Sequence, residues 1–393
     1  EGKEVGIQSI CLEEDDAKIL GDEGAVRKFG LERLGVPLVE IATEPFEVKP
    51  QHVKKIALSL GRILRSTKKV KRGLGSIRQD VNVSIKEGGV VIEVKGVQQL
   101  EQLEKVVEYE AKRQHGLLRI SKKLREKNWI HDYKSDRKDI TELFSKCKSK
   151  IIQNAIKKNQ KIFAISFRNM AGMFGYSPYE GIRLGKEVAE LVRFFGLGGV
   201  FHSDELPNYG VEESDLENLK EFLKINENDG FLILAIPEEK IHTVVNQIIL
   251  RIKHIKNEGI PIDTRLATQT GETKFLRPRP GAARMYPETD LPLLKIPRNL
   301  INEAKRDLPR LRKEVEKDFD KMGLNPDMIR LLFKQNKFGE FKALLKIINK
   351  PVLIAKVLLM YPREIAARSK RDLKEIEEIL DAHFDSVLQK VKN

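Results

Sequence analysis

The chain has 393 residues and a formal net charge of +14 at pH 7. This length is too great for one hydrophobic core, and we expect about two to four domains. The excess of Lys and Arg favours a polyanionic partner such as nucleic acid. Charged residues of both signs make up 33% of the chain, however, and Lys- and Glu-rich proteins of thermophiles share that balance. No apolar run reaches the roughly 18 residues of a membrane span, and no signal peptide is visible.

The two cysteines, Cys11 and Cys147, form no Cys-x-x-Cys pair. Their spacing argues against a disulfide framework and a cysteine-based zinc site, and it favours a reducing, cytoplasmic setting. The histidines lack His-Glu-x-x-His and His-x-His spacing, and no nucleophile elbow is present, so zinc hydrolysis and serine-type acyl transfer are not favoured. Because the first residue is Glu1 rather than Met, we expect a fragment of a longer protein.

The first part of the chain alternates short apolar runs with Gly and Pro. Over residues 1–95 this pattern predicts mainly antiparallel strands, with one helix at about 50–65. Residues 98–127 change to a helical period, with Leu100, Leu103 and Val107 on one stripe. The polar, Lys-rich residues 128–160 are predicted to form a hinge.

Strands and helices alternate from residue 161 to residue 256, which predicts a compact α/β module. The module looks inserted, because an extended, Pro- and Gly-rich style returns at 261–297. Its strands are expected at 162–167, 199–202 and 231–236, and its helices at 181–195, 211–223 and 237–256. Residues 299–393 are predicted to be nearly all helical, with helices at 300–322, 327–334, 340–348, 351–360, 362–367 and 373–390.

Two extended stretches, residues 36–44 and 76–85, each place polar groups on one face, because successive side chains of a strand point to opposite faces. Glu40 and Glu44 share a face of the first stretch. In the second, a polar face opposes an apolar face of Ile77, Val81, Val83 and Ile85; the polar face consists of Ser76, Arg78, Asp80, Asn82 and Ser84. A half-buried sheet requires only alternation, so this concentration of polar groups predicts a site for a hard cation and phosphate.

The acidic run at residues 12–16 is a further source of metal ligands. Mg²⁺ usually takes one or two carboxylates together with phosphate oxygens. Glu13 and Glu14 are adjacent, so within a strand only one of them can face the same metal. Taken alone, such a run is more often a solvated turn.

Two loops carry groups typical of a functional site. Gly73 and Gly75 precede the second polar stretch and allow backbone amides to approach phosphate, with Arg78 placed to pair with it, although Gly-x-Gly alone is most often a turn. The Pro-rich residues 277–292 are either a plain linker or a stiffened loop of site-type groups. That loop carries Arg277, Arg279, Arg284, Glu288 and Asp290.

These segments together resemble a known family, the kinase subunits of tRNA-dependent amidotransferases (the GatB/GatE family). The motifs that carry the resemblance lie in order at residues 13–15, 35–45, 75–84, 93–97, 109–114, 271–274 and 285–292. Within the family the chain resembles the archaeal form, the E subunit of glutamyl-tRNA(Gln) amidotransferase. Residues 201–207 resemble the GAD domain that is also inserted in bacterial-type aspartyl-tRNA synthetases, and the bacterial amidotransferase subunit lacks this insert. Family members start earlier and end later, so we expect the start of the catalytic cradle and the C-terminal tail domain to be absent.

The resemblance implies an α+β multidomain fold. A mainly antiparallel catalytic cradle would occupy residues 1–148 and return at 261–298. The inserted α/β GAD-like domain would occupy 149–260, and a helical domain 299–393.

The resemblance also implies an ATP- and Mg²⁺-dependent ligase. Such an enzyme phosphorylates the side chain of glutamate on misacylated Glu-tRNA(Gln), giving a γ-phosphoryl-glutamyl intermediate. Ammonia from a partner, an asparaginase-like amidase (the D subunit), then displaces phosphate to give Gln-tRNA(Gln). A carboxylate has a poor leaving group, and the acyl phosphate supplies a better one.

The family's site residues are carried over to matching positions. Glu13, Glu14, Glu40 and Asp80 are the expected metal ligands, with Glu14 preferred within the first pair. Gly75, Ser76, Arg78 and Asn82 are expected to bind ATP phosphates, and Glu40, Asp80 and Arg78 are the expected catalytic residues. Glu44 and Asn82 are also expected to support the ligands. An early His/Glu-containing family motif is missing, so the metal site is expected to be incomplete.

The expected tRNA contacts form a basic cluster that follows the first helix: Arg65, Lys68, Lys69, Lys71 and Arg72. Contacts of this kind fix position rather than sequence. The alternative function is a non-catalytic tRNA-binding or scaffold fragment of the same enzyme. A synthetase-related protein is a third hypothesis, and the absence of His-x-Gly-His and Lys-Met-Ser-Lys-Ser signatures argues against it.

Overall fold

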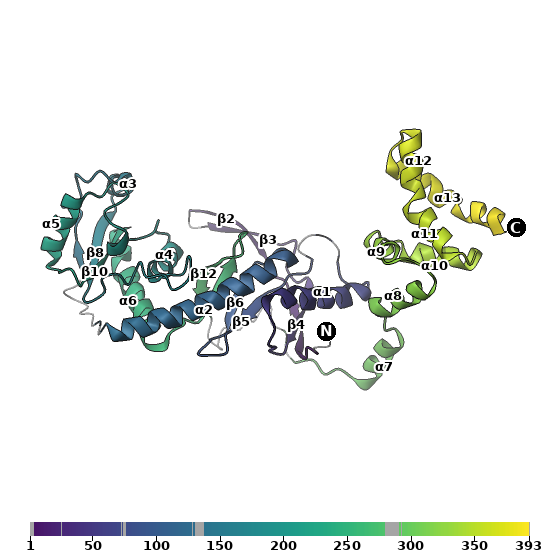
Figure 1. Ribbon diagram of the computed structural model, residues 1–393, viewed down its shortest axis with the longest axis horizontal. Coiled ribbons are helices and arrows are strands. Elements are labelled where there is room, and N and C mark those ends of the chain that lie inside the picture. Colours follow the sequence, from purple (N-terminus) through teal and green to yellow (C-terminus); the bar gives the residue numbers. More distant parts are fainter. Residues whose placement is uncertain are drawn as a thin grey trace. The chain divides into compact units, whose positions relative to one another are not determined.

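The computed structural model describes residues 4–24, 26–71, 73, 76–127, 129, 137–279, 291 and 293–392. The chain divides into two compact units, residues 1–58 with 72–294 and residues 59–71 with 295–393. The first unit mixes helices with small sheets, and in the second the described elements are helices (Figure 1). The fold is therefore α+β, as expected. The finer division into cradle, insertion and helical domain remains a prediction.

The described strands all lie in the first unit. They form two two-stranded sheets, β1-β4 and β2-β3, and two four-stranded sheets, β12-β11-β6-β5 and β7-β8-β10-β9. Their bounds are β1 Ile7–Glu14, β2 Lys18–Glu23, β3 Val26–Gly30, β4 Pro37–Thr43, β5 Val81–Val83, β6 Ile92–Lys95, β7 Arg137–Asp139, β8 Lys161–Phe167, β9 Phe201–His202, β10 Gly230–Ile236, β11 Asp263–Ala267 and β12 Thr273–Pro278.

The helices match most of the predicted segments, because an apolar stripe at helical spacing identifies a helix that packs on a core. Those that begin in the first unit are α1 Pro50–Ser66, α2 Leu103–Glu126, α3 Lys150–Lys157, α4 Leu184–Phe194, α5 Glu213–Leu223 and α6 Ile241–Glu258. Those of the second unit are α7 Arg298–Arg306, α8 Arg312–Lys321, α9 Pro326–Lys334, α10 Phe338–Ile347, α11 Pro351–Leu359, α12 Tyr361–Ser369 and α13 Leu373–Lys392.

Strand pairing in the first part of the chain is antiparallel, as predicted: β1 with β4, β2 with β3 and β5 with β6. The strand expected at 76–85 is much shorter than predicted. Only Val81–Val83 is a strand, and Ser76, Arg78 and Asp80 lie before it in irregular backbone that begins with a turn at Gly73. The predicted strand is therefore wrong outside Val81–Val83, and the predicted alternation holds within β5, where Asn82 is exposed between Val81 and Val83.

The sheet β12-β11-β6-β5 joins residues that are far apart in the sequence. Strand β11 runs parallel to β6, although α2 and the β7–β10 sheet lie between them in the chain. One face of this sheet is buried, with Val83, Ile92 and Val94 almost completely covered and α2 in contact with β5 and β12. The opposite face is therefore the one on which polar groups can collect.

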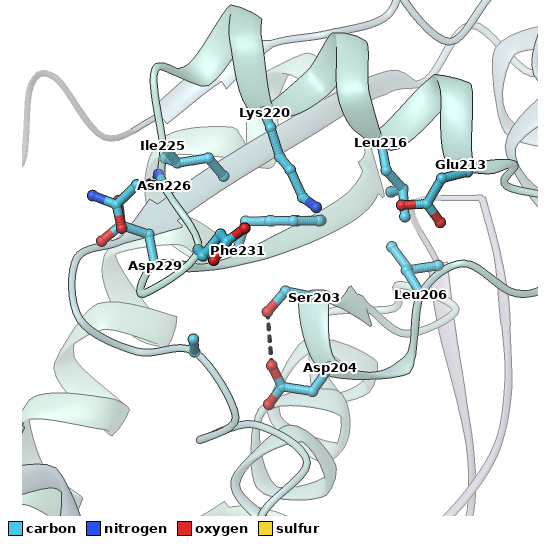
Figure 2. Close-up of a pocket in the computed structure, with 12 residues that line it drawn as sticks. Ser203, Asp204, Leu206, Glu213, Leu216, Lys220, Ile225, Asn226, Asp229 and Phe231 are labelled. Atoms are coloured by element: carbon cyan, nitrogen blue, oxygen red, sulfur yellow. Dashed lines mark hydrogen bonds between the residues drawn. The ribbon is translucent and has the colours of Figure 1, made fainter.

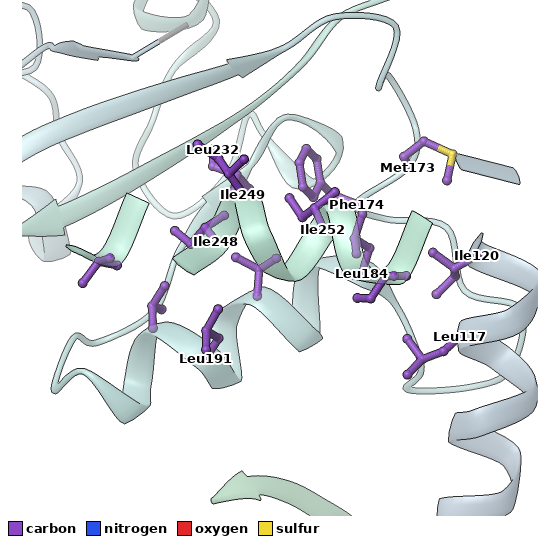
Figure 3. Close-up of a cluster of buried hydrophobic side chains, with 14 of the residues drawn as sticks. Leu117, Ile120, Met173, Phe174, Leu184, Leu191, Leu232, Ile248, Ile249 and Ile252 are labelled. Carbon is purple, nitrogen blue, oxygen red and sulfur yellow. The ribbon is translucent and has the colours of Figure 1, made fainter. Parts of the chain in front are cut away.

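The region from β7 to α6, which the sequence predicts to be an insertion, is built on the sheet β7-β8-β10-β9, which is antiparallel throughout. Strands and helices alternate along the chain, as expected for an α/β module. The segment between β8 and its sheet neighbour β10 contains α4, β9 and α5, and β10 runs antiparallel to β8. Helices cover both faces: α4 and α6 contribute to one core, with Leu191 and Ile248, and α3 and α5 to another, with Ile152 and Leu219. Figure 3 shows part of the first core.

A buried ionic network fixes α2, α4, α6, β11 and β12 together. Arg113 of α2 donates from Nε to Glu187 Oε1 of α4 over 2.7 Å, and from Nη1 to Glu110 Oε1 over 2.8 Å. Arg251 of α6 donates to both carboxylate oxygens of Asp263, at 2.7 and 2.6 Å. The remaining members are Glu190, Arg265 and Thr273. Burial disfavours the charged carboxylate of Glu187, but Arg113, Arg265 and Arg251 hold its pKa well below the usual range.

The second unit has its own core, which includes Phe319, Phe341 and Leu358. The long helix predicted at 300–322 is wrong in one respect. It is two helices, α7 and α8, separated by a segment that contains Pro309. A proline in a helix interior removes a backbone donor and clashes with the preceding turn, which explains the break.

Candidate active site

A row of polar side chains crosses the face of the sheet β12-β11-β6-β5 that lies opposite the buried Val83, Ile92 and Val94. The strand registers place Arg277 opposite Thr264, Thr264 beside Glu93, and Glu93 opposite Asn82. Thr264 Oγ1 donates to Glu93 Oε2 over 3.0 Å, so these side chains do share a face. Asn82 and Arg277, which the sequence singled out from distant segments, therefore belong to the same sheet face.

Lys95 connects this row to Asp80. Its Nζ lies 3.0 Å from Asp80 Oδ2 and 3.0 Å from Glu93 Oε1. Burial lowers the pKa of the Lys95 ammonium, but the hydrogen bonds to Asp80 and Glu93 outweigh that effect and raise the pKa above its ordinary value. Lys95 is therefore a fixed cation beside a predicted metal ligand.

The acidic run at residues 12–16 meets the second polar stretch at Asp15. Arg33 binds Asp15 in a fork, at 3.1 and 3.0 Å, and Arg78 Nη2 lies 3.3 Å from Asp15 Oδ1. Partial burial disfavours the charged form of Asp15, but the two guanidinium groups hold its pKa below the ordinary value. Ser76, a predicted phosphate ligand, donates from Oγ to Gly73 O over 2.8 Å in the turn before Arg78.

The strand register separates Glu13 from Glu14. Cys11 is opposite Glu40 and Glu13 is opposite Leu38, so Glu13 and Glu40 share one face of the β1-β4 sheet. Glu14, opposite Pro37, points to the other face. The register therefore favours Glu13 as the partner of Glu40, whereas Glu14 was preferred from the sequence. Glu44 follows the end of β4, and its backbone N–H donates to Gly6 O.

The groups on these faces fit Mg²⁺ held jointly with phosphate. Across the described ranges, no three His, Cys, Asp or Glu side chains gather into a closed metal site. Mg²⁺ commonly takes one or two protein carboxylates and completes its shell with phosphate oxygens and water. A pair such as Glu13 and Glu40 matches that demand. Arg277 Nε is buried without a hydrogen-bond partner among the described residues, as expected of a donor that awaits an anion.

The predicted tRNA contacts lie on exposed backbone. Arg65 is in the last turn of α1, and the exposed Lys68, Lys69 and Lys71 follow in a turn that Thr67 stabilises. Gly75, Arg72, Arg284, Glu288 and Asp290 lie outside the described residues. For them the sequence predictions stand untested.

A separate recess of about 220 Å³ lies in the region from β7 to α6, and Lys220 of α5 reaches into it (Figure 2). Its lining includes Asp204 and Asp229, but both carboxylates bind backbone amides: Asp204 those of Gly172 and Gly175, and Asp229 those of Asn169 and Asn226. The recess contains none of the predicted site residues, so we do not assign it to the active site.

Comparison with known proteins decides the family. Residues 1–302 match the GatB/GatE catalytic domain. The E subunit of glutamyl-tRNA(Gln) amidotransferase from Methanocaldococcus jannaschii is 44% identical over 394 residues, covering 99% of this chain and 61% of the relative. The chain belongs to the GatB/GatE family. The same amidotransferase subunits of Sulfurisphaera tokodaii and Pyrococcus abyssi are 42% and 40% identical, covering 88% and 98% of this chain and 55% and 60% of those relatives.

The GatB/GatE chain spans about three fifths of the length of these relatives. The match to the GatB/GatE catalytic domain and the identity to these relatives confirm the family that was recognised from short motifs. No helix in the described part of the chain combines the length and apolar character that a membrane crossing requires.

The structure gives two of the motifs in this GatB/GatE chain a structural role. Glu110, Arg113 and Gln114, within residues 109–114, are buried, and Gln114 Nε2 donates to Val83 O over 2.9 Å. Thr273, within residues 271–274, donates to Glu110 Oε2 over 2.7 Å. These residues hold the back of the sheet whose front carries Asp80 and Asn82.

Sequence reasoning missed Lys95, Thr264 and Asp15 as members of the site. The alternation of residues 92–95, with Ile92 and Val94 buried and Glu93 and Lys95 between them, was a usable signal for Lys95. Thr264 gave no such signal, because its role depends on a parallel strand pair. Asp15 lies within the predicted acidic run, but its ion pair with the distant Arg78 could not be read from the sequence.

Proposed function

We propose that this chain is the core of an ATP-dependent kinase and transamidase subunit that converts Glu-tRNA(Gln) to Gln-tRNA(Gln). The family match and the names of the relatives support the tRNA-dependent amidotransferase assignment. The observation that supports the phosphoryl-transfer step is the polar sheet face, which carries the Lys95–Asp80 ion pair and, across β11, Arg277.

The side chains have separate tasks in this proposal. Lys95, Arg78 and Arg277 bind and orient the phosphates of ATP, as fixed cations do in phosphoryl transfer. Glu13, Glu40 and Asp80 would hold Mg²⁺, which when bound neutralises charge between the nucleotide and the substrate carboxylate. Asp80 is paired with Lys95 in the structure, so binding of a nucleotide requires Lys95 to share its ammonium between Asp80 and a phosphate.

The chemistry then proceeds in two displacements. An oxygen of the glutamate side-chain carboxylate attacks the γ-phosphorus of ATP, and ADP leaves. Ammonia, supplied by an asparaginase-like amidase partner, attacks the acyl carbon, and phosphate leaves. The alternative is a tRNA-binding or scaffold role without chemistry.

Product analysis separates the two functions. Labelled Glu-tRNA(Gln) is incubated with the chain, its amidase partner, glutamine, Mg²⁺ and ATP, and the amino acid is released and identified. Labelled glutamine that forms only when ATP is present supports the kinase proposal. If tRNA is bound at low salt but no glutamine forms, the kinase proposal is wrong for this chain and the scaffold role stands.

A further inference from the structure

The second half of α2 carries an unpaired cluster of basic side chains. Residues 117–127 contain five basic residues and one acidic residue: Arg119, Lys122, Lys123, Arg125, Lys127 and Glu126. Arg119, Lys122, Lys123 and Arg125 are exposed and make no ion pair to any described residue. By contrast, Lys112 in the first half is paired with Glu108 at 2.7 Å.

The helix dipole accounts for Lys123 and Arg125, which lie in the last turn of α2, but not for Arg119 and Lys122, which come before it. Cations near a helix C-terminus are favoured by the helix dipole, but that effect falls off within the last turn. Helix α2 ends at Glu126, so Arg119 lies about two turns before the end. Arg119 and Lys123 are four residues apart and share one face of the helix, beside the stripe of buried Leu117, Ile120 and Leu124.

Two tyrosines fix the two central cations. The guanidinium carbon of Arg119 lies 4.8 Å from the ring centroid of Tyr179, and Nζ of Lys123 lies 3.9 Å from that of Tyr176. Both rings are half-buried, and Tyr176 packs against the core that contains Leu191 and Ile248. A cation held over an aromatic ring keeps its charge and loses little further freedom when it binds an anion. We call Arg119, Lys122, Lys123 and Arg125, with Tyr176 and Tyr179, the α2 strip.

We propose that the α2 strip binds the phosphate backbone of the tRNA, as a contact surface separate from the basic cluster at residues 65–72. Basic side chains interleaved with aromatic rings suit RNA, because cations pair with phosphate and exposed ring edges can meet bases or riboses. The identity of the RNA rests on the proposed function. The contact itself rests on the charge and geometry of the strip.

A charge-reversal pair tests the strip against a matched control. In the test variant, Arg119→Glu and Lys123→Glu reverse two charges on α2. In the control, Lys150→Glu and Lys157→Glu reverse two exposed charges on α3, which covers the other face of the β7-β8-β10-β9 sheet. Binding of fluorescein-labelled, uncharged tRNA(Gln) is measured by anisotropy from 50 to 200 mM salt, after thermal unfolding has shown that both variants are folded.

We expect the α2 variant to bind tRNA at least about tenfold more weakly than the control variant. Its plot of log K against log salt should be less steep by about 1.5, since each phosphate that is no longer neutralised removes roughly 0.7–0.9. Equal weakening in both variants, or none in either, would overturn the inference. So would an equal loss of binding to polyglutamate, because the strip would then recognise acidic polymers in general.

The tRNA-binding and glutamine-formation experiments together distinguish failure of the α2 strip from failure of the proposed function. If the wild-type chain binds tRNA through the strip but forms no glutamine, the proposed function fails and the strip stands. If glutamine forms normally and the α2 variant binds tRNA as the control does, the strip is wrong and the proposed function stands.

Discussion

Arg78 and Asp15 form an ion pair at 3.3 Å that ties the segment before β5 to the end of β1. Arg33 occupies the same carboxylate with two hydrogen bonds, so Asp15 holds two arginines from different segments. This pair brings the predicted phosphate-binding segment next to the acidic run. Asp15 therefore holds the Arg78 guanidinium in position, and that guanidinium can bind a phosphate as well as Asp15.

Asp15 should make stability depend on pH. Its pKa is lower in the folded chain than the ordinary value of 3.8, so the stabilisation is present above that value and is lost as pH falls through the folded-state pKa. We expect Asp15→Asn to lower the free energy of unfolding by about 1 kcal/mol at pH 7. Urea unfolding at pH 7 and pH 3 measures this. A difference between wild type and variant that grows as the pH is lowered would contradict the assignment.

The buried ionic network should be far more sensitive than surface ion pairs. Arg113→Met leaves Glu110 and Glu187 buried without their main partner, and we expect a loss of about 3–5 kcal/mol. Arg27→Met in the exposed pair with Asp22 is the control, and it should change stability little. Chemical unfolding followed by circular dichroism compares the two. Similar effects of both variants would show that the network does not hold the first unit together.

The separation of Glu13 and Glu14 by the strand register predicts different effects on metal binding. Glu13→Gln should weaken the apparent affinity for Mg²⁺ by at least about tenfold, because Glu13 shares a face with Glu40. Glu14→Gln should have a smaller effect. Titration calorimetry with Mg²⁺ and a non-hydrolysable ATP analogue measures both. A larger effect of Glu14→Gln would restore the preference drawn from the sequence alone.

Part of this site could be predicted from the alternation of side chains along the sequence. The other part depends on contacts between segments that are distant in the sequence. Alternation in residues 81–85 correctly separated Val81 and Val83 from Asn82, and α2 and β4 were predicted close to their observed bounds. The pattern could not show that Ser76, Arg78 and Asp80 precede the strand, because a turn and a strand both accept that sequence. The ionic network was also invisible, since its members come from five elements that meet only in the folded chain.

The basic cluster after α1 predicts a salt-sensitive interaction with tRNA. Changing Lys68, Lys69 and Lys71 to Gln should make log K for tRNA less steep in log salt by about 0.7–0.9 for each phosphate that the variant no longer binds. The control changes Lys150, Lys157 and Lys158, which are exposed on and beside α3. Filter binding over a range of salt concentrations gives the slopes. A control slope that falls as much as the test slope would mean that net charge alone is being measured.

The central claim is that the polar face around Asp80 and Lys95 carries phosphoryl transfer. The most direct test is ADP release by the chain with its amidase partner, in the presence and absence of Glu-tRNA(Gln). Wild type is compared with Asp80→Asn and with Asp22→Asn, which changes an exposed, ion-paired carboxylate on β2. We predict that ADP release requires the misacylated tRNA, falls by at least about a hundredfold in Asp80→Asn, and is unchanged in Asp22→Asn. Release by Asp80→Asn at the wild-type rate would contradict the account.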